Sequence, residues 1–195
     1  MKTKEHILQT AADAFAAKGF SGVRIDELAR DAGINKATLY YHFRSKQEIF
    51  EHVMQRQFVK LQERLNTAVE MVGTPEEKLS VFIDTMFARE RRDVVLIVRE
   101  IIEGGVNLSD GFLRTMEQIH AILYRVLKEG KTQGIFLRDD PQEAMAALIG
   151  ISDFYILGAP LRKKLESLHR KDASVKIPLD LRQQAKSLIF TMLQH

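Results

Sequence analysis

The chain has 195 residues, 45% of them hydrophobic, which is enough for one large domain or for a small domain joined to a larger one. Its formal net charge is only +3 and its isoelectric point is near 9.1, so a polyanionic partner would need a local concentration of positive charge. Cysteine is absent, which excludes disulfide bonds, thiol catalysis and cysteine-ligated zinc.

Hydrophobic residues recur at helical spacing along almost the whole chain, and no segment alternates as a strand would. A first helix is expected to stop at Gly19, and a second to cover residues 25–32. Asn35 is a suitable N-cap for a third helix that ends near Phe43. The sequence SKQE at residues 45–48 predicts a capping box at the start of a long fourth helix.

The later helices are marked by similar signals. The sequence TPEE at residues 74–77 predicts a second capping box with proline at the first helical position. Helices are then expected at about 93–103 and 109–134, after DPQE at residues 140–143, and finally at about 179–193. The sequence therefore predicts an all-α fold of about nine helices, with residues 168–176 as its most loop-like stretch.

The segment 144–161, AMAALIGISDFYILGAPL, carries one charge, Asp153. Eighteen residues are about the minimum for a bilayer span. The segment contains two glycines and a proline and has no second apolar segment beside it. We therefore interpret it as a helix buried in a core or a subunit interface, not as a membrane helix.

Three short helices joined by tight turns are typical of a helix-turn-helix, whose second helix enters the major groove of DNA. The sequence GINKATLYYHF at residues 33–43 places several hydrogen-bonding side chains on one short helix, while Leu39 and Phe43 suit a core. Lys36 could bind a phosphate or a guanine edge, and Lys46 a further phosphate. The spacing alone is also compatible with two simpler roles, which are packing of the aromatic residues and solvation of the lysines.

The stretch ILQTAADAFAAKGFSGVRIDELARDAGINKATLYYHFRSKQEIF, within residues 5–50, resembles the N-terminal pattern of the tetracycline-repressor (TetR) family of bacterial transcriptional regulators. The resemblance implies a homodimer that binds a palindromic operator and is released by a small-molecule effector. Where the family commonly has Thr or Ser opening the second helix, this chain has Arg24, which loses a capping hydroxyl and gains a guanidinium. The expected DNA-binding residues are Arg24, Asn35, Lys36, Ala37, Thr38, Tyr40, Tyr41, His42 and Lys46.

We expect residues 1–45 to form the DNA-binding domain and residues 46–195 a helical domain for ligand binding and dimerisation. Ligand pockets are mainly apolar with a few polar groups. The candidate lining residues are Phe58, Phe82, Met86, Phe87, Arg99, Met116, His120, Tyr124 and Tyr155, although a Phe or Met on a helical stripe is more often core than pocket. Residues 144–161 and the final helix, with Leu181, Leu188, Ile189 and Leu193, are expected to pair with a second subunit.

Two alternatives share the DNA-binding prediction: an activator, and a ligand-independent DNA-binding protein with an organising or recruiting role. An enzyme is disfavoured because the sequence contains no HExxH, no phosphate-binding glycine loop and no nucleophile motif. We expect no catalytic residues, no metal site and no cofactor. The expected partners are double-stranded DNA, an unidentified small molecule and a second copy of the chain. The charged N-terminus lacks a secretory signal, so we expect a cytoplasmic protein that does not bind membranes.

Overall fold

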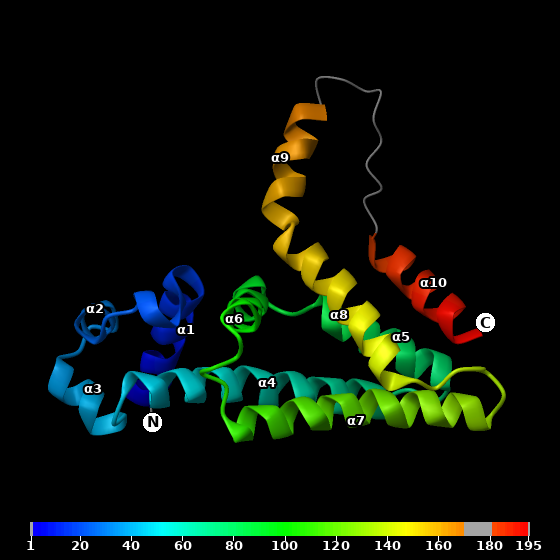
Figure 1. The fold of residues 1–195 in the computed structure, drawn as a ribbon, viewed down its shortest axis with the longest axis horizontal. Coiled ribbons are helices and arrows are strands. Elements are labelled where there is room, and N and C mark those ends of the chain that lie inside the picture. Colours follow the sequence, from blue (N-terminus) through cyan, green and yellow to red (C-terminus); the bar gives the residue numbers. More distant parts are fainter. Residues whose placement is uncertain (1, 170–180, 195) are drawn as a thin grey trace. The chain divides into compact units, whose positions relative to one another are not determined.

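A computed structural model describes residues 2–169 and 181–194, and within those ranges every regular element is a helix (Figure 1). The predicted all-α fold is confirmed. The described helices are α1 (Lys2–Gly22), α2 (Ile25–Asp31), α3 (Lys36–His42), α4 (Lys46–Glu70), α5 (Pro75–Phe87), α6 (Arg91–Ile102), α7 (Asp110–Thr132), α8 (Pro141–Leu157), α9 (Ala159–His169) and α10 (Leu181–Gln194).

The described part of the chain contains ten helices, one more than predicted, because the apolar segment near residue 158 is divided. Gly158 closes α8 and α9 begins at Ala159. Pro160 has no N–H to continue the hydrogen bonds of α8, and the two helices bend by 54° at the break. Most of the predicted loop at residues 168–176 lies outside the described residues.

The predicted helix ends are largely confirmed. Gly19 interrupts α1 with a left-handed φ of 72°, a conformation that favours glycine. The Asn35 side chain caps α3 and Thr74 forms the full capping box of α5. At α4 the Ser45 hydroxyl accepts a bond from the Glu48 N–H, but the Glu48 carboxylate accepts from the N–H of Arg44 instead of that of Ser45.

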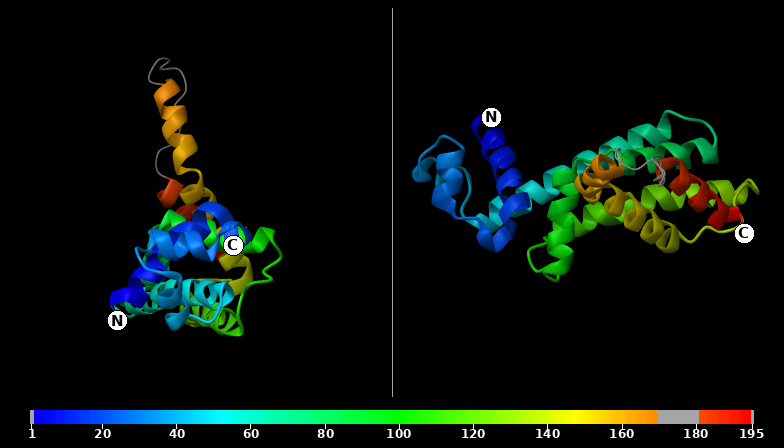
Figure 2. Two further views of the ribbon diagram at one scale, coloured as in Figure 1. Left: turned by 90° about the vertical axis from the view of Figure 1, so that its left-hand side faces the viewer. Right: turned by 90° about the horizontal axis from the view of Figure 1, so that it is seen from above.

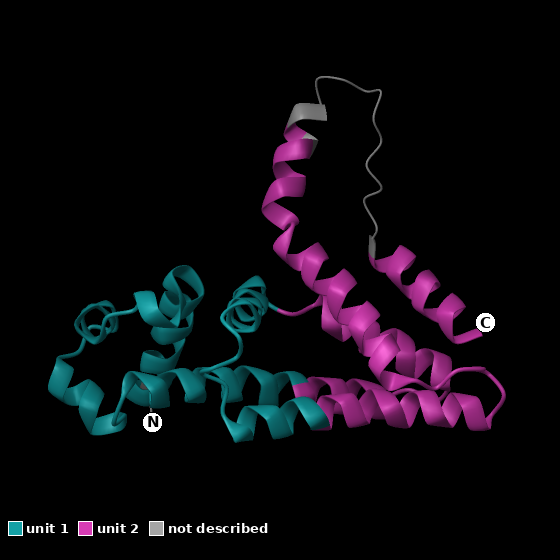
Figure 3. Cartoon of the chain, in the orientation of Figure 1, with its two compact units in different colours: residues 1–61, 90–117 teal, residues 62–89, 118–195 magenta. Residues whose placement is uncertain are grey.

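The chain divides into two compact units (Figure 3). Unit 1 contains residues 1–61 and 90–117, and unit 2 contains residues 62–89 and 118–195. Helices α4 and α7 each contribute to both units. The expected division between residues 45 and 46 concerns function, and it remains a prediction.

The core of unit 1 is aromatic. Phe15, Phe20 and Phe50 contact one another with ring centroids 5.0–6.0 Å apart, and Phe58 meets Phe112 at 4.7 Å. Helix α1 packs against both α2 and α6. The helices that carry the predicted DNA-binding residues are therefore attached to a common core in this unit.

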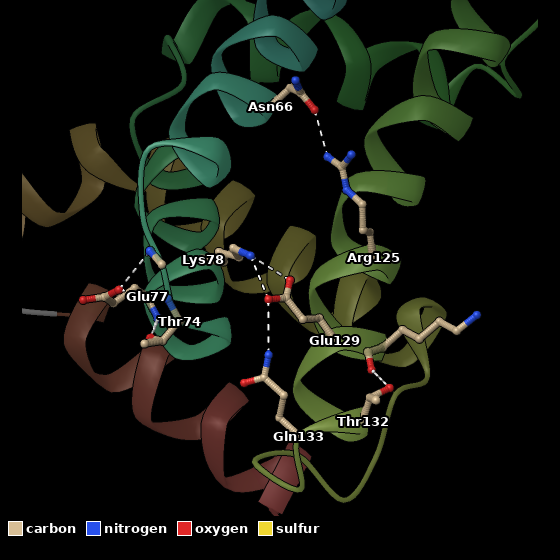
Figure 4. A network of polar contacts seen from close by, with 10 residues as sticks. Asn66, Thr74, Glu77, Lys78, Arg125, Glu129, Thr132 and Gln133 are labelled. Carbon is tan, nitrogen blue, oxygen red and sulfur yellow. Dashed lines mark hydrogen bonds and ion pairs between the residues drawn. The ribbon is translucent and has the colours of Figure 1, made fainter.

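In unit 2, α8 packs against α5 and α10 (Figures 1 and 2). Polar contacts join other helices of this unit, as Figure 4 shows: Lys78 of α5 binds both carboxylate oxygens of Glu129 on α7, at 2.7 and 2.8 Å. Arg125 of α7 donates to the side chain of Asn66 on α4. These contacts fix the mutual positions of α4, α5 and α7 within the unit.

The apolar segment has one buried face and one exposed face. Leu148, Ser152 and Ile156 of α8 are buried, whereas Phe154 is 77% exposed. Burial on most sides, as predicted, is therefore not observed within the single chain. Among the described helices none alone is long and apolar enough to cross a bilayer, and only the bent pair α8 and α9 reaches that length and composition together.

Candidate nucleic-acid interface

Helices α2 and α3 are joined by a tight turn of fixed geometry. Gly33 adopts a left-handed φ of 65°, and the following N–H of Ile34 donates back to the carbonyl of Ala29. Leu28 of α2 and Leu39 of α3 are buried. The turn and these two anchors hold α3 as the second helix of a helix-turn-helix, as the sequence predicted.

The outer face of α3 carries exposed aromatic side chains. Tyr41 is 86% exposed and Tyr40 46%, and the Tyr41 ring meets the ring of His42 edge to face. Ala37 is also exposed, so no bulky side chain stands at that position of the helix start. An exposed face with rigid aromatic rings and hydrogen-bonding groups suits contact with base edges and phosphates.

The polar side chains at the start of α3 already have partners within the protein. The Asn35 Oδ1 atom accepts from the backbone N–H of Thr38 at 2.7 Å and from its hydroxyl at 3.0 Å. Lys36 forms an ion pair with Asp26 of α2, with Nζ 2.8 Å from Oδ1. The hydrogen bond to Asp26 raises the pKa of Lys36. Sequence reasoning identified Asn35, Lys36 and Thr38 but did not foresee Asp26.

Lys46 lies half-buried at the start of α4. Its ammonium donates to the carbonyls of Phe20 at 3.0 Å and Val23 at 3.2 Å, and it lies 4.4 Å from the centroid of the Phe20 ring. These bonds connect the end of α1 to the start of α4. Lys46 therefore has a structural role beside the phosphate contact that the sequence predicted.

Arg24 occupies the N-cap position of α2 in an extended conformation, without a capping bond from its side chain. The first turn of that helix contains Asp26 and Glu27, whose negative charges favour a helix N-terminus. Glu27 binds Lys18 at 2.7 Å, and this hydrogen bond lowers the pKa of Glu27. Charged residues thus stabilise the helix start, where no capping hydroxyl is present.

Two arginines of α6 bind α1 within unit 1. Arg99 donates to the carbonyls of Ala16 at 3.1 Å and Ala17 at 3.2 Å, and Arg92 pairs with Asp13 at 2.9 Å. Because the helical geometry of α1 breaks at Gly19, these two carbonyls lie where intrahelical acceptors are left unused. Sequence reasoning had placed Arg99 among the candidate lining residues of a ligand pocket instead.

The predicted effector-pocket residues are divided between the two units. In unit 1, Phe58 is buried against Phe112, Arg99 binds α1, and Met116 is partly buried. In unit 2 lie Phe82, Met86, Phe87, His120, Tyr124 and Tyr155. Neither unit therefore contains all of the residues that were predicted to line one pocket.

Within unit 2, Phe82, Met86 and Phe87 are buried, and the Phe87 ring meets the Tyr155 ring edge to face at 5.3 Å. His120 is partly buried and Tyr124 is 43% exposed. Tyr124 lines an open groove of about 470 Å³ along α7. Phe87 and Tyr155 are therefore neighbours, as a shared pocket wall requires.

A buried polar cluster that the sequence did not single out lies where α5 meets α8. Arg89 pairs with Asp153 and donates to the hydroxyl of Ser152 at 2.7 Å. The side chains of Arg89 and Asp153 are only 8% and 11% exposed. The available signal was the single charge of Asp153 within an apolar stretch, but nothing in the sequence pointed to its partner.

A groove of about 590 Å³ in unit 1 was also missed. It lies along α4, and none of the predicted effector residues lines it; the lining residues are Leu8, Glu51, His52, Gln55, Arg56, Val59, Lys60, Ser109 and Gly111. Among the described residues, the Oε1 atom of Gln55 is buried and finds no hydrogen-bond partner. The groove is lined by both apolar and charged side chains. The helical stripe of α4 identifies only the apolar residues of that helix, so it does not predict the groove.

Comparison with known proteins identifies the region around α3. Residues 7–53 match the model of the bacterial regulatory proteins of the tetR family. The HTH-type transcriptional repressor NicS of Pseudomonas putida is 25% identical over 144 residues, which cover 71% of this chain and 68% of NicS.

Two solved structures share the fold over nearly the whole chain. PfmR of Thermus thermophilus, a TetR family regulator, is 25% identical, covers 96% of both chains and has a TM-score of 0.69. AibR, solved with isovaleryl coenzyme A and operator DNA, is 18% identical, covers 98% of both chains and has a TM-score of 0.68. The likeness to AibR concerns the fold alone.

Proposed function

We propose that the chain, whose residues 7–53 match the model of the bacterial regulatory proteins of the tetR family, is a DNA-binding transcriptional regulator of that type and acts as a homodimeric repressor. It binds a palindromic operator and releases it when a small molecule binds. The observation that carries the proposal is α3, a short helix fixed by Asn35 and Leu39 whose outer face exposes Tyr40 and Tyr41.

In the proposed complex α3 lies in the major groove. Ala37 allows close approach to the bases, and Tyr41 and His42 offer hydrogen bonds from rigid side chains. Lys36, Thr38 and Tyr40 contact base edges or phosphates, and Arg24 and Lys46 contact the flanking backbone. Two such helices bind half-sites about 34–36 Å apart, one turn of B-DNA.

The proposed dimer pairs α8 and α10 with the same helices of a second copy. Support comes from one stripe of α8, where Ala146, Gly150 and Phe154 are all exposed at four-residue spacing, and from Leu188 of α10, which is 51% exposed. Ile189 and Leu193 face the interior of unit 2 instead, and the side chain of Leu181 lies outside the described residues. Small residues at such spacing permit close packing of two helices.

The substitution Phe154→Glu tests the dimer. Since Phe154 is exposed in the single chain, the variant should keep its helical content, and a charge in a helix-packing interface should dissociate the subunits. Sedimentation analysis would detect the change, and DNA affinity should fall with it. An F154E protein that remains dimeric would refute this interface.

The proposed effector binds unit 2 near Phe87, Tyr155 and the Arg89–Asp153 pair. A buried polar cluster beside aromatic side chains fits a mainly apolar ligand with one polar group. Acyl-coenzyme A compounds are the first class to test, because AibR, which shares the fold, was solved with isovaleryl coenzyme A. Helix α4 belongs to both units and is the proposed link, which requires an effector with different affinities for the two states.

Selection of bound duplexes from a random DNA library at moderate salt, followed by sequencing, tests the function. An enriched inverted repeat is the expected result, and its affinity should fall when the effector is added. Absence of enrichment by a folded, dimeric protein, with and without candidate effectors, would refute operator recognition. The proposed site of action is the cytoplasm, where a bacterial operator is accessible.

A further inference from the structure

The contact between Asp26 and Lys36 places a carboxylate inside the surface proposed to meet DNA. Asp26 is in the first turn of α2, and Lys36 is the first residue of α3. Both side chains are largely open to solvent, at 73% and 54% exposure. An exposed pair of this kind is weak and can exchange partners.

A negative charge here opposes the general attraction to DNA. Non-specific binding depends almost entirely on contacts between cationic side chains and phosphates. Asp26 occupies the Lys36 ammonium at 2.8 Å, so any phosphate must compete with a carboxylate that is already in place. Asp26 also repels the phosphates themselves. Both effects weaken most strongly the complexes that depend on a phosphate contact of Lys36.

The same contact restricts where the Lys36 ammonium can lie. A lysine side chain is flexible and can follow phosphates on any sequence. Bound to Asp26, the ammonium stays close to the start of α2 and beside the first turn of α3. Asn35 and Thr38 next to it also form hydrogen bonds within the protein, so the polar side chains at the start of α3 have internal partners before DNA binds.

We propose that Asp26 is a specificity-determining residue that restrains Lys36 and thereby suppresses binding to non-operator DNA. This inference rests on the proposed function. In the operator complex, base contacts of α3 supply affinity that random DNA cannot give. Non-operator complexes depend on a phosphate contact of Lys36 and must displace Asp26, whereas the operator complex, held by base contacts, leaves the pair in place and does not carry this cost. Specificity is raised by weakening the wrong complexes, a strategy known from other selective interfaces.

The test is a comparison of wild type and Asp26→Asn on two duplexes: the enriched inverted repeat and a shuffled sequence of the same composition. Fluorescence anisotropy at several salt concentrations gives the affinity and its salt dependence. For D26N, the affinity for shuffled DNA should rise about threefold, and the salt slope should steepen by about 0.9, as for one added phosphate contact. Affinity for the inverted repeat should rise less, so the specificity ratio falls.

Two control variants separate this effect from a general change of charge. Asp31→Asn removes the same charge from α2, where the carboxylate lies 3.6 Å from Arg30 instead, and should leave the specificity ratio unchanged. In a Lys36→Met background, D26N should no longer steepen the salt slope. Equal effects in D31N, persistence of the slope change in K36M, or no gain on shuffled DNA would each overturn the inference. A wild type that binds neither duplex would refute the proposed function itself.

Discussion

The helix-turn-helix and unit 2 each contain an ion pair, but the two pairs differ in burial. Lys36 pairs with Asp26 of the neighbouring helix, and both side chains are exposed to solvent. Arg89 in unit 2 pairs with Asp153, which lies 64 positions away in the sequence, and both side chains are almost fully buried. An exposed pair contributes about 0–1 kcal/mol and can exchange partners. Removing one member of a buried pair leaves an unpaired charge in the protein interior.

The difference matches what each region has to do in the proposed mechanism. The surface of α3 must give up its internal partners for bases and phosphates, and weak, exposed contacts permit this. The contact between α5 and α8 must keep one arrangement until an effector changes it. Substitutions in the two regions should therefore differ in both size and kind of effect.

The largest effect is expected for Arg89→Met. The variant leaves the Asp153 carboxylate buried without its cation, which should lower the free energy of unfolding by about 3 to 5 kcal/mol. Urea denaturation followed by circular dichroism measures the change. The double substitution R89M/D153L, which replaces the pair by apolar groups, should recover most of the loss.

The matched control for R89M is Arg91→Met, which removes an exposed arginine two residues away. A surface change of this kind should shift stability by no more than about 0.5 kcal/mol. If R89M cost no more than R91M, the buried pair would have no special importance, and the contrast between the two regions would fail.

The packing of unit 2 should be equally intolerant at Gly130 of α7. Glycine to alanine within a helix normally stabilises by about 0.5 to 1 kcal/mol, but a Cβ atom here would lie 2.2 Å from the Phe136 ring. Phe136 is fully buried, so Gly130→Ala should instead cost about 3 kcal/mol. The same urea experiment measures it.

Gly150→Ala provides the matched control, because a Cβ atom at this helical position meets nothing within 4 Å in the described part of the single chain. Measured in the Phe154→Glu background, where α8 faces solvent, it should be stabilising. A destabilising G150A and a neutral G130A would invert the expected pattern and contradict the packing of α7 against Phe136.

The sequence was most informative where contacts are local. The Asn35 and Thr74 caps, the turn at Gly33 and the buried Leu39 were predicted because each depends on residues a few positions apart. Asp26 was missed as the partner of Lys36 because the pairing depends on how α2 crosses α3. The start of α2 shows the same limit, since the charges that stabilise it in place of a capping hydroxyl include a lysine from α1.

The body was less predictable because its contacts join distant segments. A helical stripe places Phe87 and Tyr155 on the apolar faces of their helices, but it does not show that the two rings contact each other. The partner of Asp153 could not be read from α8 alone. The break at Gly158 was missed because the apolar run hid the effect of Pro160 on the helix, and two helices were therefore predicted as one.

A moderate effect is expected at Lys46, because its part-buried side chain forms internal hydrogen bonds and is also a predicted phosphate contact. Lys46→Met removes two hydrogen bonds to the Phe20 and Val23 carbonyls and should lower stability by about 1.5 kcal/mol. If Lys46 also contacts phosphate, affinity should fall equally for all DNA sequences, and the salt slope should decrease by about 0.9. Urea denaturation and anisotropy titrations measure the two effects separately.

Tyr41→Ala is the comparison for Lys46→Met. Tyr41 is almost fully exposed, so stability should remain within about 0.5 kcal/mol of wild type, while affinity should fall with a change in sequence preference. Equal losses on every duplex for both variants would contradict a base contact by Tyr41. A K46M variant with normal DNA binding and reduced stability would limit Lys46 to its structural role.

The smallest effect is expected at Glu77, an exposed group that depends on local bonds. Its carboxylate accepts from the N–H groups of Thr74 at 3.0 Å and Gly73 at 3.2 Å, and these bonds lower its pKa below the ordinary value of 4.5. A lowered pKa contributes stability that is present above the unfolded-state value and is lost as the pH falls through the folded-state value. The stability advantage of wild type over Glu77→Gln should therefore be constant at neutral pH and shrink below about pH 4.5.

Urea midpoints measured from pH 7 to pH 3 would follow this loss. Glu76→Gln removes the neighbouring charge of the same helix turn, which is not the acceptor in the capping box, so the difference in midpoint between wild type and E76Q should depend less on pH. If the differences for E76Q and E77Q shrank in parallel as the pH fell, the cause would be the general attraction of a negative charge to a helix N-terminus. A steeper change in the difference between wild type and E77Q would instead show that even an exposed group acts through its specific bonds, as the buried Arg89 pair does at far greater cost.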